Sequence, residues 1–247
     1  MNKKISLILV LLVLITTSTC RANEAANIES NTPQSDHSVK FMGGLGVGYN
    51  TYNSSVVSIG QFSLIPKFAA TYRNKKHERL SLSLSTFFTA IPLNSSPVSI
   101  KGISDDVTIR YLGANLRFGY ETPWLPAPWH LQINLGWYYN TTFVTNNRFG
   151  YVNAMGPQLF PMVDYQINEN SKVGGYLKFS PLSSNGVSLK NSEFNYELAF
   201  GTHYMPPGLI LEKYKYTINF DFAHLTMKQE SIRMFANSSS IGLSLLF

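Results

Sequence analysis

The strongest constraint on the fold of this chain is an alternation of apolar and polar residues that begins after residue 38 and continues to residue 247. Successive side chains of a β-strand point to opposite faces, so each alternating segment has one apolar and one polar face. The clearest segment alternates Leu112, Ala114, Leu116, Phe118 and Tyr120 with Gly113, Asn115, Arg117, Gly119 and Glu121. Helical spacing does not fit these segments. The pattern therefore predicts an all-β fold.

The alternating segments follow one another along the chain and are separated by turn residues. Strands are predicted at 39–51, 56–72, 79–90, 107–121, 129–141, 155–167, 172–180, 193–204, 213–223 and 232–247. The connections at 73–78, 122–128, 168–171 and 205–212 include the tighter turns, and those at 91–106, 142–154, 181–192 and 224–231 are longer or richer in Ser and Asn. This alternation of connections is typical of bacterial outer-membrane barrels. We therefore expect a closed antiparallel transmembrane β-barrel of about 10 strands, with 8 or 12 as alternatives.

Two soluble folds, a β-sandwich and a lipocalin-like barrel, also use alternating strands, but they place the apolar face inside. Aromatic residues near the strand ends favour a membrane barrel, whose interfacial girdles require them. These aromatic residues are Tyr49, Tyr72, Tyr120, Trp129, Trp137, Tyr139, Tyr204 and Tyr214. The opposite face carries the candidate lumen-lining residues Arg117, Glu121, Glu193, Glu197, Lys215 and Asp221, which can pair with one another in a wet lumen.

The N-terminal segment has the three parts of a cleavable secretory signal. Lys3 and Lys4 precede an apolar run at 5–15, which is too short to span a bilayer as a helix, and Ala22 suits the last position before cleavage. Lipidation of Cys20 is a rival outcome, although the residues before it depart from the lipoprotein pattern. The predicted organisation is a signal peptide at 1–22, a flexible periplasmic segment at 23–38 and the barrel at 39–247.

Composition and motifs exclude several function classes. Removal of residues 1–22 leaves 17 basic and 14 acidic residues, a charge of +3, and the chain has no run of five like charges, so nucleic-acid binding is not expected. A single Cys excludes a disulfide framework and a Cys-based zinc cluster. The chain contains no HExxH, GxSxG or phosphate-binding loop. We therefore expect no metal, no cofactor, no catalytic site and no enzymatic activity.

The final segment, Ile241-Gly242-Leu243-Ser244-Leu245-Leu246-Phe247, places apolar residues two, four and six positions before a terminal Phe. It resembles the C-terminal signal of outer-membrane β-barrels, which the barrel-assembly machinery reads in that class. The assembly residues would be Ile241, Leu243, Leu245 and Phe247. The resemblance implies the outer membrane of a Gram-negative bacterium, with its lipids, including lipopolysaccharide, as the surroundings.

A barrel of about ten strands lies near the size that side chains fill. We therefore expect a small monomeric barrel with a largely filled lumen, which is structural or passes only ions and small solutes. Gly44, Gly46 and Gly48 share the polar face of their strand, which predicts curvature or room for bulky lumen residues or for part of segment 23–38. Prolines weaken strands, so bulges or strand ends are predicted at Pro66, Pro157 and Pro161.

The alternatives are an outer-membrane hydrolase with a site at the rim, acting on lipid or peptide, and a surface adhesin or receptor. The omptin proteases are ten-stranded barrels with acidic pairs and an Asp-x-His at the outer rim. This chain departs from that pattern, because Asp105 and Asp106 are adjacent and Asp221 precedes His224 by three residues. Asp221 and His224 are nevertheless the best available candidates for catalysis, and Ser231 is a further possible partner of His224. An adhesin would be expected to carry longer outer loops.

Overall fold

The computed structural model describes residues 37–54, 58–89, 91–94, 96–100, 103–144, 151–184, 195–210, 213–229 and 232–247. All of these residues belong to one compact unit, Asp36–Phe247. The predicted signal peptide at 1–22 and nearly all of the predicted segment at 23–38 lie outside the described residues. Within the described part of the chain, no helix has the length and apolar character needed to cross a bilayer.

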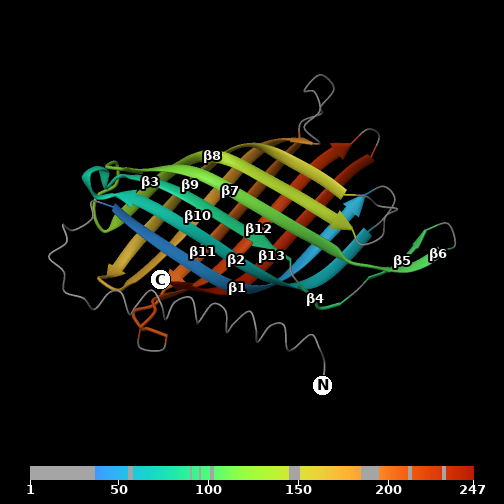
Figure 1. The fold of residues 1–247 in the computed structure, drawn as a ribbon, viewed down its shortest axis with the longest axis horizontal. Coiled ribbons are helices and arrows are strands. Elements are labelled where there is room, and N and C mark those ends of the chain that lie inside the picture. The colour runs from blue at the N-terminus through green and yellow to red at the C-terminus, as the bar shows by residue number, and fades with distance from the viewer. Residues whose placement is uncertain are drawn as a thin grey trace. The chain divides into compact units, whose positions relative to one another are not determined.

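Ten long strands form the wall of a barrel (Figure 1), and they correspond to the ten predicted segments. They are β1 (His37–Ser54), β2 (Ser58–Asn74), β3 (Leu80–Phe88), β7 (Ile109–Thr122), β8 (Trp129–Val144), β9 (Tyr151–Asn168), β10 (Ser171–Ser184), β11 (Asn195–Met205), β12 (Tyr216–Gln229) and β13 (Ile232–Leu246). The short strand β4 (Ile91–Pro92) continues the pairing of β3 along β2. A 3-10 helix, Lys75–His77, forms the tight turn between β2 and β3.

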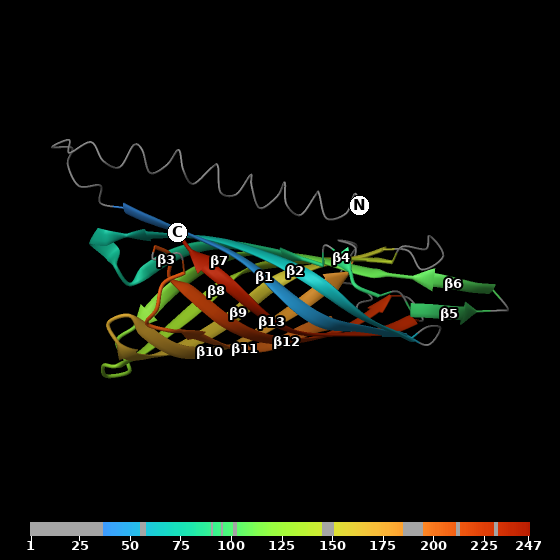
Figure 2. The same cartoon turned by 90° about the horizontal axis from the view of Figure 1, so that it is seen from below.

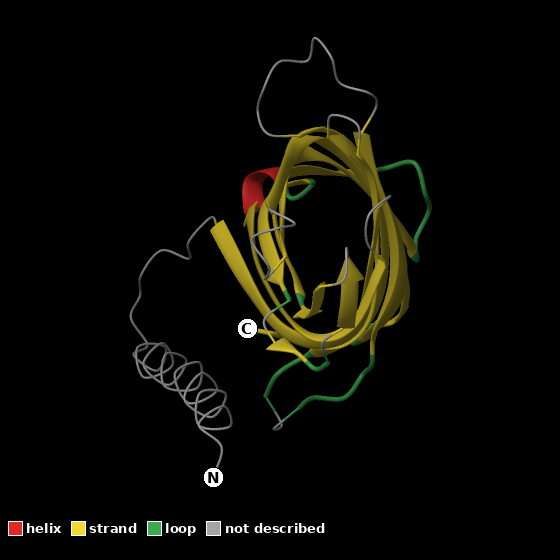
Figure 3. Ribbon diagram, turned by 90° about the vertical axis from the view of Figure 1, so that its right-hand side faces the viewer, coloured by secondary structure: helices red, strands yellow, loops and turns green. Residues whose placement is uncertain are grey.

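The sheet closes on itself because β1 pairs with both β2 and β13 (Figure 3). Each neighbouring pair of strands is antiparallel. We start at Thr51 on β1 and step from each residue to its paired residue on the next strand. One circuit of the ring then returns to β1 at Val39, twelve positions before Thr51. This stagger tilts the strands relative to the barrel axis, as closure of a sheet requires.

The apolar face of the strands points outward and the polar face points inward. Along β7, Leu116 and Phe118 are 44% and 65% exposed, whereas Asn115, next to Leu116, is 8% exposed. Large aliphatic and aromatic side chains are exposed on every long strand, whereas soluble monomers rarely expose large contiguous apolar surfaces. The prediction of a membrane barrel is therefore confirmed. The two soluble alternatives are excluded, because they would bury Leu116 in a dry core.

The predicted bulges or strand ends are wrong at Pro157 and Pro161, which lie inside β9 with the same register on both sides. Pro66 lies where the pairing of β2 passes from β3 to β4 with a register shift of one residue. Pro66 is paired with β1 but not with β3 or β4. Pro157 and Pro161 are paired with β8 but not with β10. Proline has no backbone N–H to donate to a carbonyl oxygen of a neighbouring strand. Each proline is therefore accommodated where the hydrogen-bond ladder to that strand is interrupted.

The strands extend further toward the loop end than the sequence predicted. The expected loop at 224–231 begins only after Gln229, and strand structure continues to Val144 and Ser184 on β8 and β10. Polar residues form strands there because both neighbours supply ladder partners. The connection from β4 to β7 forms a separate hairpin of β5 (Ser96–Ile100) and β6 (Ile103–Val107), which lies beyond the barrel at the end opposite the C-terminus (Figures 1 and 2).

Candidate functional site

The lumen of the barrel carries most of the buried polar and charged side chains of the described residues. Strand alternation directs every second residue into it, so the inward set follows from the register. Exposure falls steeply along the lumen. His130, near the tight-turn end where both termini of the barrel lie, has a side chain that is 47% exposed, whereas Lys178, further in, is 7% exposed. Water therefore enters the lumen from the tight-turn end and is progressively excluded.

The mouth at the tight-turn end contains two carboxylates, each held by two basic groups. The Glu121 carboxylate lies 3.5 Å from Arg73 Nη1 and 2.9 Å from His130 Nδ1. The Asp164 carboxylate lies 2.5 Å from Lys172 Nζ and 2.9 Å from His203 Nε2. The first cluster joins β7 to β2 and β8, and the second joins β9 to β10 and β11, so the two clusters follow one another around the rim of the mouth.

A belt of side chains crosses the lumen above this mouth. The Arg117 guanidinium lies 4.4 Å from the centre of the Phe160 ring, and Phe160 stacks on Tyr176 with ring centres 4.7 Å apart. The Tyr176 hydroxyl donates to Asp221 Oδ1 at 2.6 Å, and Asp221 also forms an ion pair with Lys67. The contacts run from Arg117 on β7 through side chains of β9, β10 and β12 to Lys67 on β2. Several of these strands are not neighbours in the wall, so the belt crosses the interior of the barrel.

The next layer contains the most deeply buried ion pair among the described residues. Lys178 Nζ lies 2.6 Å from Glu197 Oε1, with side chains that are 7% and 5% exposed. The same ammonium lies 3.0 Å from the centre of the Tyr138 ring, and Tyr138 is 0% exposed. The Tyr138 hydroxyl accepts a hydrogen bond from Asn140 at 2.9 Å. A buried pair of this kind is tolerated because each charge is compensated locally.

The lumen near the loop end is occupied by an apolar layer rather than by ions. Its buried members are Tyr52, Ile59, Ile109, Tyr111, Tyr138, Ala154, Leu225, Met227, Met234 and Ala236. The cavity bounded by Tyr52, Thr142, Leu225, Met227, Met234 and Ala236 measures about 10 Å³. That volume is at or below the minimum needed for one water molecule. Side chains therefore fill the lumen at this level.

The predicted lumen residues occupy different places. Arg117, Glu197 and Asp221 lie inside the lumen, and Glu121 lies at its tight-turn mouth. Lys215 precedes the first residue of β12, and its Nζ donates to Asn170 Oδ1 of a neighbouring turn at 3.3 Å, so it belongs to the turn region. Glu193 lies outside the described residues.

Several residues of the lumen were not singled out from the sequence as lumen candidates. They are Lys67, Asp164, Tyr176 and Lys178, which complete the ion pairs and the belt. Lys67 follows Pro66, and Asp164 follows Pro161, so both lie in strands whose alternation is poor. Lys178 and Tyr176 could have been found by counting every second residue of the predicted segment at 172–180.

The two described catalytic candidates, Asp221 and His224, point to opposite faces of β12. Asp221 faces the lumen and pairs with Lys67, whereas His224, three residues along the same strand, faces outward. The His224 ring nitrogens lie 2.6 Å from Asn237 Oδ1 and 3.0 Å from Thr226 Oγ1. Asp105 and Asp106 are in β6, but their side chains and residue Ser231 lie outside the described residues. Among the described residues, no group of three or more His, Cys, Asp or Glu is placed to hold a metal ion.

The inward glycines make room for lumen side chains. A Cβ on Gly48 would lie 2.5 Å from Ile65 Cδ1, and one on Gly44 would lie 2.3 Å from Ser244 Oγ. At Gly46 the nearest atoms are backbone atoms of β13. The predicted close approach of a bulky lumen residue is therefore present at Gly48. The other predicted occupant is part of segment 23–38, of which residues 23–36 lie outside the described residues.

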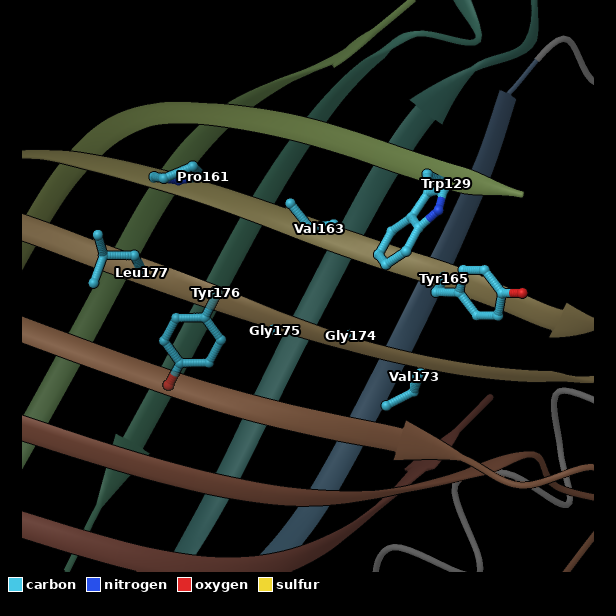
Figure 4. A pocket seen from close by; sticks show the side chains of 9 residues that line it. All are labelled: Trp129, Pro161, Val163, Tyr165, Val173, Gly174, Gly175, Tyr176 and Leu177. Carbon is cyan, nitrogen blue, oxygen red and sulfur yellow. The ribbon is translucent and has the colours of Figure 1, made fainter. Parts of the chain in front are cut away.

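The outward surface has an aromatic pair near each end of the strands. The rings of Tyr49 and Phe62 lie 4.8 Å apart toward the loop end, and those of Trp129 and Tyr165 lie 4.8 Å apart toward the tight-turn end. Such rings mark the two interfaces of a membrane barrel. Next to Trp129 and Tyr165, an open apolar groove of about 660 Å³ runs over β9 and β10 to Pro161 and Leu177 (Figure 4).

The C-terminal residues form the outward face of β13. Ile241, Leu243 and Phe247 are 61%, 42% and 40% exposed, and Leu245 shares their face. The Phe247 backbone N–H donates to the carbonyl oxygen of Phe41 at 2.9 Å, so the last residue is fixed against β1. The strand that carries the predicted assembly signal thus closes the barrel.

Comparisons with known proteins identify the fold. No family model and no curated protein matches the sequence. The outer membrane protease OmpT of Escherichia coli is similar over 89% of this chain and 99% of its own, with a TM-score of 0.52 and 10% identity. The beta domain of the Bordetella autotransporter Brka covers 85% and 99% with a TM-score of 0.48 and 9% identity. Neisserial surface protein A covers 83% and 96% with a TM-score of 0.39 and 11% identity. The similarity to OmpT, together with the ring that β1 closes with β13, shows that the chain has the closed, ten-stranded antiparallel fold of outer-membrane β-barrels.

Proposed function

We propose that this chain is a monomeric outer-membrane protein whose barrel is structural and does not conduct. One chain completes the ring by pairing β1 with β13, which supports a monomer. The observation that carries the proposal is the apolar layer, in which Tyr138, Ile109 and Ile59 are 0%, 0% and 2% exposed. A dewetted apolar constriction opposes passage of ions. The barrel then serves to anchor the segments at its loop end, including the β5–β6 hairpin, in the membrane.

A second part of the proposal is that the chain has no enzymatic activity. The described carboxylates of the lumen are committed to ion pairs, and His224 and Asp221 lie on opposite faces of β12. Incubation with lipid and peptide substrates is therefore expected to give no turnover. A cleavage activity that His224→Ala abolishes would contradict this part of the proposal.

Planar-bilayer recording of the purified barrel at high salt tests closure. The wild type is expected to give a flat current trace. The matched control is a variant with Tyr52→Ala, Tyr111→Ala and Met234→Ala, which removes three large side chains of the apolar layer while leaving the ion pairs intact. This variant is expected to give discrete current steps, which shows that the barrel inserts under the same conditions. Steps of similar size from the wild type would overturn the proposal and favour a narrow passage.

A further inference from the structure

The described carboxylates of the lumen are all matched by basic groups. The pairs are Glu121 with Arg73 and His130, Asp164 with Lys172 and His203, Asp221 with Lys67, and Glu197 with Lys178. Arg117 lies in the same lumen, but it forms no ion pair with a described residue. Because an arginine side chain remains protonated in proteins, the lumen carries a positive charge at Arg117 that the described residues do not compensate.

The surroundings of the Arg117 guanidinium are neutral. Its Nη2 donates to Ser85 Oγ at 2.7 Å, and the group lies 4.4 Å from the centre of the Phe160 ring. Its Nε is buried and has no hydrogen-bond partner among the described residues. The Ser85 hydroxyl and the Phe160 ring replace only part of the hydration that the Arg117 guanidinium loses on burial. An opposite charge in contact with the guanidinium would offset the remaining cost. The described residues therefore leave the positive charge of Arg117 without an opposite charge in contact with it.

Water reaches the belt in which Arg117 lies. Lys67 and Asp221, in the same belt, keep side-chain exposures of 20% and 26%. The lumen opens toward the tight-turn end, where His130 and Arg73 are exposed, and the apolar layer fills it on the other side. A small ion can therefore reach this belt from the tight-turn end.

We propose that Arg117 binds a small inorganic anion of the halide class, which enters from the tight-turn end of the lumen. The planar guanidinium offers the ion the Nη N–H groups that do not meet Ser85, while Phe160 supports its face and Ser85 fixes Nη2. The proposal is independent of conduction, because the ion enters and leaves by the same mouth.

Crystals of the full-length folded barrel grown with sodium bromide in place of chloride test the site directly. The wild type is expected to show an anomalous bromide peak within hydrogen-bond distance of the Arg117 guanidinium. Arg117→Met is expected to lose the peak. Arg73→Met is the matched control, because Arg73 is already paired with Glu121, and it is expected to keep the peak at Arg117.

Ser85→Asp keeps the proposal testable if Arg117→Met does not fold. It places a carboxylate where Nη2 now meets a hydroxyl at 2.7 Å, so the built-in anion is expected to displace bromide. In solution, the wild type should gain thermal stability with the logarithm of bromide concentration, relative to gluconate at equal ionic strength, and Ser85→Asp should not. Absence of a peak at Arg117 in the wild type, or a peak that survives in Ser85→Asp or Arg117→Met, overturns the proposal. Either result leaves the measurement of conductance unaffected.

Discussion

Removal of one member of the Lys178–Glu197 pair should destabilise the barrel far more than removal of an exposed charge. Lys178→Met keeps most of the side-chain volume but leaves Glu197, which is 5% exposed, as a buried carboxylate without its counter-ion. Breaking a buried pair in this way costs about 3–5 kcal/mol. The contact of the ammonium with Tyr138 adds up to about 2 kcal/mol. We therefore expect the free energy of unfolding to fall by at least about 3 kcal/mol.

Two controls separate this effect from a general loss of charge. Arg73→Met removes one partner of Glu121, but the two side chains are 41% and 29% exposed, so a change of at most about 1 kcal/mol is expected. The double variant Lys178→Met with Glu197→Gln removes both charges and should recover most of the loss, because no unpaired carboxylate remains.

Reversible denaturant unfolding of the barrel in lipid vesicles, followed by tryptophan fluorescence, measures these differences. The reasoning is refuted if Lys178→Met and Arg73→Met have equal effects, or if the double variant is as unstable as Lys178→Met. Equal effects would mean that water reaches the Lys178 layer, and the closed lumen would then also be in doubt.

Three further predictions concern the wall of the barrel. Leu135→Arg, within the outward apolar band, should lower the free energy of unfolding in vesicles by about 2–4 kcal/mol. Leu80→Arg, at a strand end, should lower it by only about 0–1 kcal/mol. Equal costs would contradict the assigned lipid face. Gly136→Ala should lower the unfolding midpoint strongly because its Cβ would lie 2.0 Å from the Leu116 carbonyl oxygen; Gly175→Ala, whose nearest contact is at 3.2 Å, is the matched control and should change the midpoint little. Phe247→Ala should slow assembly by the barrel machinery more than unaided folding into detergent, measured as the gel shift of the folded barrel; an equal slowing would argue against a role as a signal.

The sequence was sufficient to predict the strands and the face to which most residues point, because alternation with period two directly reports the backbone geometry. Leu116 and Arg117, for example, lie on the outward and inward faces as their positions in the pattern indicate. The boundaries were less predictable, since Lys215 has the inward position by counting but precedes the start of β12 at Tyr216. Strand ends depend on ladder partners, which alternation does not encode.

The partners within the lumen could not be predicted for a different reason. Lys67 meets Asp221, which is 154 residues away in the chain, because the twelve-residue stagger of the closed ring brings β2 and β12 to the same height. Alternation gives the face of each residue but not its height along the barrel. That no described carboxylate pairs with Arg117 likewise emerges only once each described carboxylate of the lumen has been assigned a partner.

The interrupted ladder between β9 and β10 also has a mechanical consequence. Pro157 and Pro161 leave this pair of strands with gaps in its backbone hydrogen bonding, and the apolar groove with Gly174 and Gly175 lies over the same place. The β1–β13 seam, where the first and last strands join, is by contrast paired without interruption from Met42 to Ser54. When the barrel is pulled or heated, we expect β9 and β10 to separate before any other described pair of strands. The amide protons of β9 and β10 should then exchange with deuterium before those of the β1–β13 seam.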